Sequence, residues 1–144
     1  MLGKSFEVDE DLFWNEERYK TLVKHAVKQI GYVATIGDEA AEDALIGLFA
    51  SLSRSTTSEA VLKTVNDAVC MTTRSDDAPE RLLALRVLDE MWAQQEELIQ
   101  FAATTISDFI SETLEDADPA VERAAKKFLD RMRAVLGNEI DNYF

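Results

Sequence analysis

The side chains that most often carry out catalysis or bind metals are rare in this sequence and far apart. It contains a single histidine, His25, and a single cysteine, Cys70. A zinc site needs about four such ligands at suitable spacings, and a cysteine nucleophile needs a neighbouring base. Cys70 is therefore expected to be a small buried apolar residue. The sequence predicts no catalytic residue, no metal and no cofactor, and hence a protein that is not an enzyme.

Carboxylates are abundant, but they occur where helix structure explains them. The chain has 28 acidic and 15 basic residues and a net charge of −13. Clusters at 38–43 and 115–118 fall at expected helix starts and turns, where the helix dipole favours negative charge. Acid–base catalysis would instead require two carboxyl groups in unequal environments within one pocket. The acidic balance also disfavours a broad nucleic-acid-binding face, because it repels phosphates.

Two groups of basic residues could form an interaction surface. Lys20, Lys24 and Lys28 are four residues apart and make a stripe along one helix. A second patch lies on the last helix. Each group could meet an acidic partner or an RNA phosphate, although a solvated helix face is the favoured interpretation. The second patch consists of Arg123, Lys126, Lys127, Arg131 and Arg133.

Aromatic residues give two further candidates. Tyr143 and Phe144 end an apolar tail that begins at Ile140. The tail either folds back over the open end of the helical array, which is the favoured interpretation, or docks on another subunit. For Trp92, filling the core is favoured over acting as an exposed interface anchor.

The spacing of apolar residues predicts helices along most of the chain. From Trp14 onward, apolar residues recur at steps of three and four, as on one face of an α-helix. Residues 53–58 are expected to form a polar loop, and residues 1–11, which are charged and poor in apolar residues, a leader or linker. No apolar run is long enough to span a membrane. Expected starts or caps of the later helices are Asp38, Ser58, Asp77 and Asp118, and Gly37 and Gly137 are expected to end the first and last helices.

Two stretches of the chain have nearly the same pattern of residues. DAPERLLALRVLDEM begins at Asp77 and DPAVERAAKKFLDRM at Asp118, and with Asp38 the starts are 39 and 41 residues apart. Such a period predicts an all-α solenoid of about three HEAT-like antiparallel helix pairs over residues 12–137, followed by a tail over 138–144. The apolar columns that repeat are Leu45, Ala84 and Ala125; Leu48, Val87 and Phe128; Phe49, Leu88 and Leu129; and Leu52, Met91 and Met132.

The segments TTRSDDAPERLLALRVLDEMW and DFISETLEDADPAVERAAKKFLDRMRAVLGNEIDNYF carry a more specific signal. Over residues 72–144 the chain resembles the C-terminal end of the U-three small nucleolar RNA-associated protein ten family. Members of this family are very large HEAT-repeat proteins of the UtpA subcomplex of the small-subunit processome. The final LGNEIDNYF is the most discriminating part of the resemblance.

The resemblance implies a non-catalytic, protein-binding scaffold module in the nucleolus of the nucleus. Such a module would support processome assembly and pre-rRNA processing, with other UtpA proteins as partners. Association with pre-rRNA is expected to be indirect, and no small-molecule ligand is expected. Two alternatives remain open: a HEAT-type adaptor in another pathway such as transport or signalling, and a small helical enzyme or ligand carrier. The last predicts a closed pocket with convergent polar groups.

A slice of a longer solenoid would have one further property. Its first or second helix should expose an apolar patch, because the preceding helix pair would pack there.

Overall fold

The computed structural model describes residues 16–56 and 58–144, and every regular element in that part is helical. The expected leader (1–11) and Trp14 lie outside the described residues. The elements are α3 (Glu16–Ile36), α4 (Glu39–Ser55), α5 (Glu59–Thr72), α6 (Ala78–Gln94), α7 (Glu96–Leu114), α8 (Pro119–Leu136) and the short 3-10 helix η1 (Gly137–Asn142).

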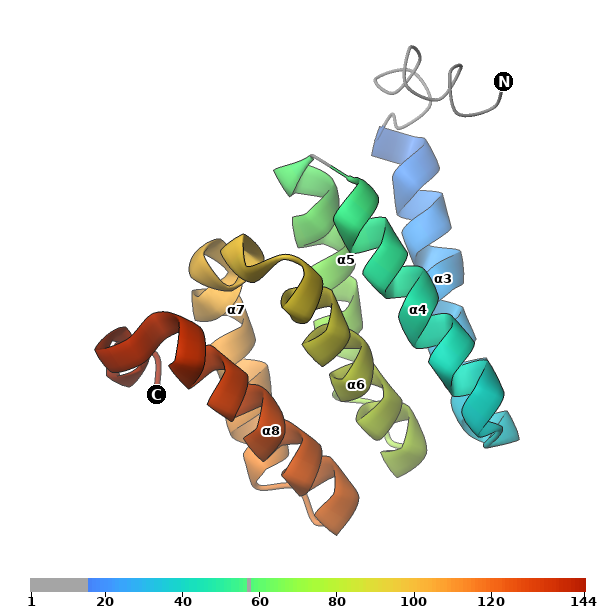
Figure 1. The fold of residues 1–144 in the computed structure, drawn as a ribbon. Helices are drawn as coiled ribbons and strands as arrows, with labels where there is room; N and C mark the ends of the chain where they lie inside the picture. Colours follow the sequence, from blue (N-terminus) through green and yellow to red (C-terminus); the bar gives the residue numbers. More distant parts are fainter. Residues whose placement is uncertain (1–15, 57) are drawn as a thin grey trace.

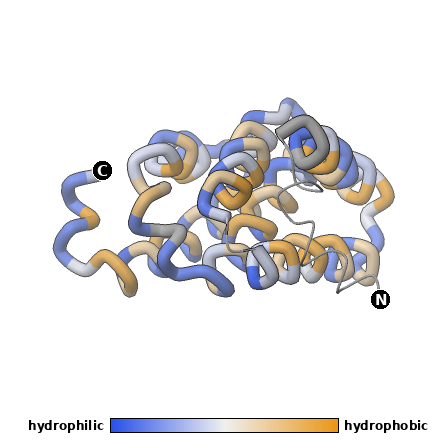
Figure 2. The backbone as a smooth tube through the Cα atoms, turned by 90° about the horizontal axis from the view of Figure 1, so that it is seen from above, coloured by the Kyte–Doolittle hydropathy of each residue, from blue (hydrophilic) through white to orange (hydrophobic). Residues whose placement is uncertain are grey.

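The helices form three antiparallel pairs that stand side by side (Figure 1). The second helices, α4, α6 and α8, make one layer, and the first helices, α3, α5 and α7, make the other. Seen from above, the two layers run alongside each other (Figure 2). Each second helix contacts the next second helix, and each first helix contacts the next first helix. The prediction of an all-α solenoid of helix pairs is confirmed.

Short polar side chains start the helices as the sequence indicates. Asp38, Ser58 and Asp118 each accept hydrogen bonds from backbone N–H groups in the first turn. Asp77 occupies the same position before α6, but its side chain makes no such bond. At Gly37 and Gly137 the backbone has φ values of 71° and 57°, which a glycine adopts without strain where a helix ends.

The expected loop over residues 53–58 is shorter than predicted, because α4 continues to Ser55. Ser53 is completely buried, and its hydroxyl donates to the Phe49 carbonyl at 3.0 Å. A serine that satisfies its own hydroxyl one turn back can occupy a helix interior.

The helix α6 lies in the middle of the stack and contacts every other α-helix of the described part. The broad apolar surface predicted for it is therefore buried on two sides, as expected for a central element. Its fully or almost fully buried residues are Leu83, Ala84, Leu85, Val87, Leu88, Met91 and Trp92.

The repeated columns form the core, with one exception. Val87 and Phe128 are inaccessible to solvent, but Leu48, their counterpart in the first pair, is 59% exposed. Leu48 therefore lies outside the core, unlike the other two members of its column. In the second and third pairs a preceding pair packs on this side, whereas the described residues supply no preceding pair for α4. Leu52 and Leu129 are only partly buried at the edge of the core.

Candidate protein-interaction surfaces

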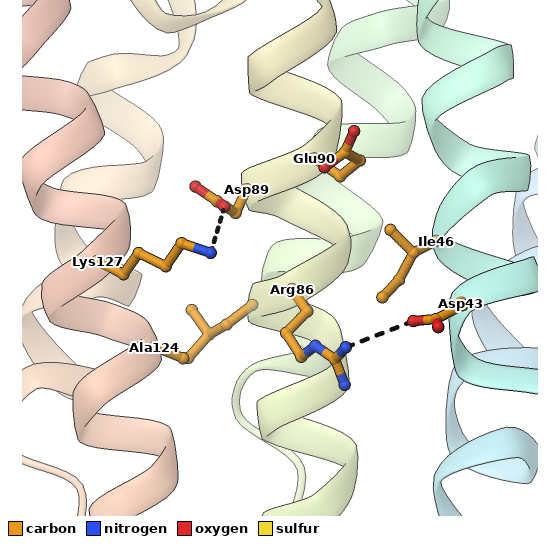
Figure 3. Close-up of a pocket in the computed structure, with 8 residues that line it drawn as sticks. Asp43, Ile46, Arg86, Asp89, Glu90, Ala124 and Lys127 are labelled. Atoms are coloured by element: carbon orange, nitrogen blue, oxygen red, sulfur yellow. Dashed lines mark ion pairs between the residues drawn. The ribbon is translucent and has the colours of Figure 1, made fainter. Parts of the chain in front are cut away.

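A polar groove of about 220 Å³ crosses the layer of second helices (Figure 3). Side chains from α4, α6 and α8 face one another across it. Its lining residues are Asp43, Ile46, Leu85, Arg86, Asp89, Glu90, Ala124 and Lys127.

Ion pairs hold the helices together on either side of this groove. Arg86 bonds Glu42 at 3.0 Å and lies 3.6 Å from Asp43, joining α6 to α4. On the other side Asp89 is bonded by Arg131 at 2.6 Å and lies 3.8 Å from Lys127, joining α6 to α8. The hydrogen bond from Asp89 raises the pKa of Arg131 further, so this guanidinium stays charged.

The groove combines paired charges with two exposed charged side chains. Within it Arg86 lies near Asp43 and Lys127 near Asp89, while the side chains of Asp43 and Lys127 remain 65% and 77% exposed. Those two ends could each take up an opposite charge on a partner. Within residues 16–56 and 58–144, no group of three or more His, Cys, Asp or Glu side chains is placed to hold a metal.

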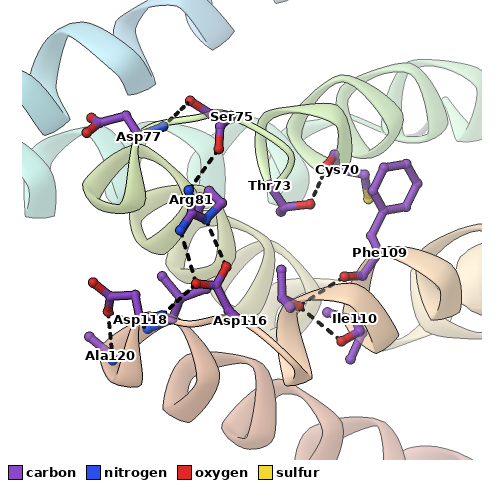
Figure 4. A network of polar contacts seen from close by, with 12 residues as sticks. Cys70, Thr73, Ser75, Asp77, Arg81, Phe109, Ile110, Asp116, Asp118 and Ala120 are labelled. Atoms are coloured by element: carbon purple, nitrogen blue, oxygen red, sulfur yellow. Dashed lines mark hydrogen bonds and ion pairs between the residues drawn. The ribbon is translucent and has the colours of Figure 1, made fainter.

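Polar contacts one repeat apart connect successive helix pairs, and the sequence did not single them out. Arg81 and Asp116 form a two-pronged pair at 2.8 and 3.0 Å (Figure 4). Arg74 and Glu112 do the same at 2.9 and 2.7 Å. The partners are 35 and 38 residues apart. Opposite charges separated by about one repeat are the signal that could have found them.

Asp116 connects the turn before α8 to the start of α6. The guanidinium of Arg81 holds the pKa of Asp116 below its ordinary value, against the effect of burial, and the backbone N–H of Asp118 adds to the lowering. Arg81 also donates to the Ser75 carbonyl at 3.0 Å. The acidic turn before α8 is therefore locked onto the start of α6.

The two predicted basic groups have different surroundings. Lys20, Lys24 and Lys28 are all exposed along α3. On α8 the cations lie beside acidic side chains: Arg131 and Lys127 beside Asp89, Lys126 beside Glu122, and Arg133 beside Asp130. Arg123 is exposed, and its Nε donates to the carbonyl of Pro119. The α8 patch is thus largely neutralised by neighbouring carboxylates.

Trp92 is a core residue, as favoured from the sequence, and not an exposed anchor. Its side chain is inaccessible to solvent, and its Nε1 donates to Oδ1 of Asn66 at 2.9 Å. Its ring meets that of Phe128 edge-on, with 4.8 Å between centroids. Since Phe128 belongs to the next pair, Trp92 fills the seam between two pairs.

The tail after α8 turns back onto that helix. Ile140 in η1 is buried, Tyr143 packs against the core, and Phe144 is 47% exposed. The first two thus pack at the C-terminal end of the stack.

A second, apolar groove of about 90 Å³ lies between α3 and α4. Its lining is Leu22, Ala26, Leu48, Phe49 and Leu52. The prediction of an exposed apolar patch on the first or second helix is confirmed. None of the described helices has the length and apolarity to cross a bilayer.

Comparison with known proteins adds a relationship by sequence. Over 142 residues and 98% of this chain, 28% of positions are identical to U3 small nucleolar RNA-associated protein 10 of Neurospora crassa. The chain is similar to U3 small nucleolar RNA-associated protein 10. The Phaeosphaeria nodorum protein of the same name is 28% identical over 97% of the chain. The HEAT repeat-containing protein 1 homolog of Drosophila melanogaster is 24% identical over 91% of it.

These comparisons confirm the resemblance expected for residues 72–144 and extend it over almost the whole chain. The chain spans only 8% of the length of the two fungal relatives and 6% of the Drosophila protein. No family model matches the chain, and no solved structure does.

Proposed function

We propose that this chain is a non-catalytic, protein-binding scaffold module of a ribosome-biogenesis factor. In this proposal it acts in the nucleolus, where it supports assembly of the small-subunit processome and pre-rRNA processing. The observation that carries the proposal is the similarity to U3 small nucleolar RNA-associated protein 10 over 98% of the chain. The name of that relative ties it to the U3 small nucleolar RNA.

The geometry supports a binding role. An array of helix pairs presents a continuous layer of second helices, and the polar groove across α4, α6 and α8 carries exposed charges of both signs. Processome proteins of the UtpA kind are the proposed partners. The net charge of −13 supports an association with pre-rRNA that is made through those proteins.

Affinity purification from the source cells, followed by mass spectrometry, tests the proposal. The tagged protein is compared with a version that lacks residues 16–144. We expect processome proteins to be depleted when the segment is removed. Recovery of transport or signalling proteins instead would favour the alternative of a HEAT-type adaptor in another pathway.

A point variant tests the groove itself. Lys127→Glu reverses an exposed charge in the groove, whereas Lys126→Glu changes the neighbouring lysine, which is not among the groove's lining residues. We expect the first variant to reduce partner recovery and the second to leave it unchanged. Equal recovery with both would exclude this groove as the contact surface.

A further inference from the structure

The polar groove on the second helices runs across α4, α6 and α8 rather than along them. Its lining on α6 extends only from Leu85 to Glu90, which is about 8 Å along the helix axis. In the other direction it spans three neighbouring helices, whose outer axes are about 18 Å apart at the usual packing distance. A helix with its side chains is about 10–12 Å wide, whereas the backbone of an extended segment is only about 5 Å wide. The shape of the groove therefore matches an extended segment.

Two of the ion pairs beside this groove are short internal contacts. Asp89 is 14% exposed, and Arg131 donates to both of its oxygens, at 2.6 and 3.4 Å. On the other side Glu42 is 21% exposed and accepts from Arg86 at 3.0 Å. These two contacts join α6 to α8 and to α4, so the charges in them are satisfied within the chain.

Three further charges at the groove lack such a short ion pair. Asp43 and Lys127 lie 3.6 and 3.8 Å from partners that already hold another residue at 3.0 Å or less. Glu90 forms no ion pair within residues 16–56 and 58–144, and it accepts a hydrogen bond from Nε2 of Gln94 at 3.2 Å. Opposite charges on a partner would therefore gain ion pairs here without breaking the short internal ones.

The charges that remain are arranged by sign across the groove. Figure 3 shows Glu90 on the α4 side of α6, the side from which Asp43 projects, and Lys127 on the opposite side, from α8. Between these charged ends the lining is apolar. The apolar lining residues are Ile46, Leu85 and Ala124. From α4 to α8 the groove thus offers an acidic end, an apolar middle and a basic end.

We propose that this groove binds an extended segment of a partner protein with the pattern basic–x–apolar–x–acidic, in either chain direction. In such a segment alternate side chains face the same way, and the first and last of them are about 13 Å apart. The basic side chain meets Asp43 and Glu90, the acidic one meets Lys127, and the apolar one packs between them. This inference rests on the proposed protein-binding function and adds the chemistry of the partner.

The groove suits other occupants less well. A second copy of this chain would present the same groove, and two concave surfaces cannot fill each other. RNA would bring phosphates towards Asp43 and Glu90, in a chain whose net charge is −13. An extended peptide satisfies both the shape of the groove and its two charged ends.

A random peptide library displayed on phage tests the pattern without a known partner. It is selected against the purified 144-residue chain and against two variants, Lys127→Glu and Lys126→Glu. We expect the unmodified chain and Lys126→Glu to enrich basic–x–apolar–x–acidic peptides, and Lys127→Glu to enrich peptides with a basic residue at both ends. Failure to enrich this pattern, or the same pattern with Lys127→Glu, would overturn the proposal.

A synthetic peptide, Lys-Ser-Leu-Ser-Glu, gives the position and the strength of binding. It is titrated into the isotope-labelled chain and followed by NMR, where the amide spectrum of each variant also shows that it is folded. We expect the shifted amides to include Ile46 and Ala124. Lys127→Glu should weaken binding by about two- to five-fold, as for one exposed ion pair, and Lys126→Glu should leave it unchanged. Shifts confined to the first helices, or equal affinity for both variants, would overturn the proposal.

The same preparations test the other occupants. Binding of an oligouridine RNA that depends on Lys127, or a dimer in sedimentation that Lys127→Glu dissociates, would also overturn the proposal. All of these measurements use purified components and no processome protein. If the peptide binds as expected but affinity purification recovers no processome proteins, the proposed function fails and the groove inference stands. If processome proteins are recovered but the groove shows no preference for this pattern, only the groove inference fails.

Discussion

Arg81 and Asp116 clamp the second helix pair to the third. The Nε and Nη2 atoms of Arg81 lie 2.8 and 3.0 Å from the two carboxylate oxygens of Asp116, and the side chains are only 18% and 10% exposed. A two-pronged pair of this kind fixes orientation as well as distance. It joins the start of α6 to the turn before α8, and so sets the position of the third pair relative to the second.

Replacing Asp116 with asparagine should destabilise the fold by about 1–3 kcal/mol near neutral pH, because the buried guanidinium loses its charged partner. Arg81 lowers the pKa of Asp116 in the folded state, so the stabilisation is present above the ordinary aspartate pKa and is lost as the pH falls through the lower folded value. The deficit of Asp116→Asn relative to the unmodified protein should therefore shrink below about pH 4. Urea unfolding of both proteins at several pH values measures this difference in the free energy of unfolding.

The exposed pair between Arg74 and Glu112 provides the control. Both side chains are about half exposed, at 45% and 51%. Glu112→Gln should lower the free energy of unfolding much less than Asp116→Asn does, because solvent screens an exposed pair. Equal losses of unfolding free energy for Asp116→Asn and Glu112→Gln would mean that burial does not strengthen the contribution of the Arg81–Asp116 pair.

The bond between Trp92 and Asn66 leads to a second prediction. Trp92→Phe removes the indole donor and leaves Asn66 without a partner for Oδ1, while its Nδ2 already has none among the described residues. We expect a loss of about 1–3 kcal/mol in the free energy of unfolding, measured by chemical denaturation. Combined with Asn66→Leu, the same Trp92→Phe change should cost less, because both polar groups are then gone. If Trp92→Phe cost as much in the Asn66→Leu background as it does alone, the coupling between the two residues would be contradicted.

Much of the fold could be predicted because local rules agree with the packing. Caps at Asp38 and Asp118, glycines at the helix ends and apolar columns with a period near 40 residues all lead to helix pairs. Ser53 was predicted in a loop because serine favours turns, but burial and a bond to the Phe49 carbonyl keep it helical.

The contact surfaces were less predictable. A column of apolar residues does not show whether a neighbour is present, so Leu48 could not be distinguished from Val87 by sequence. The partners of the α8 cations depend on the packing of α6 against α8, which brings Asp89 to Arg131 across 42 residues. Sequence alone does not identify Asp89, among 28 acidic residues, as the partner of Arg131.

The columns make a third prediction about relative stability. Leu88 is completely buried, Leu129 is partly buried, and Leu48 is mostly exposed. Leu88→Ala should cost about 2–5 kcal/mol, Leu129→Ala less, and Leu48→Ala within about 0.5 kcal/mol of zero in the 144-residue chain. Thermal or urea unfolding of the three variants ranks them. A large loss at Leu48 in this chain would show that another part of it covers that face.

Cys70 makes the fourth prediction, because its thiol is enclosed between helices. Burial raises the pKa of Cys70 to about 12 from an ordinary 9.0, Asp67 adds to the rise and Arg74 opposes it. The folded state therefore keeps a proton that the unfolded chain releases from about pH 9 upward. Stability that depends on this thiol is complete below about pH 9 and declines as the pH rises towards 12, so Cys70→Ala should show a shallower loss of stability over that range.

In neutral buffer the thiol should react with a thiol-specific reagent only as fast as the protein opens, because both access and ionisation are blocked. Rapid labelling of the native protein would contradict the enclosed position, whereas labelling that accelerates in step with urea would support it.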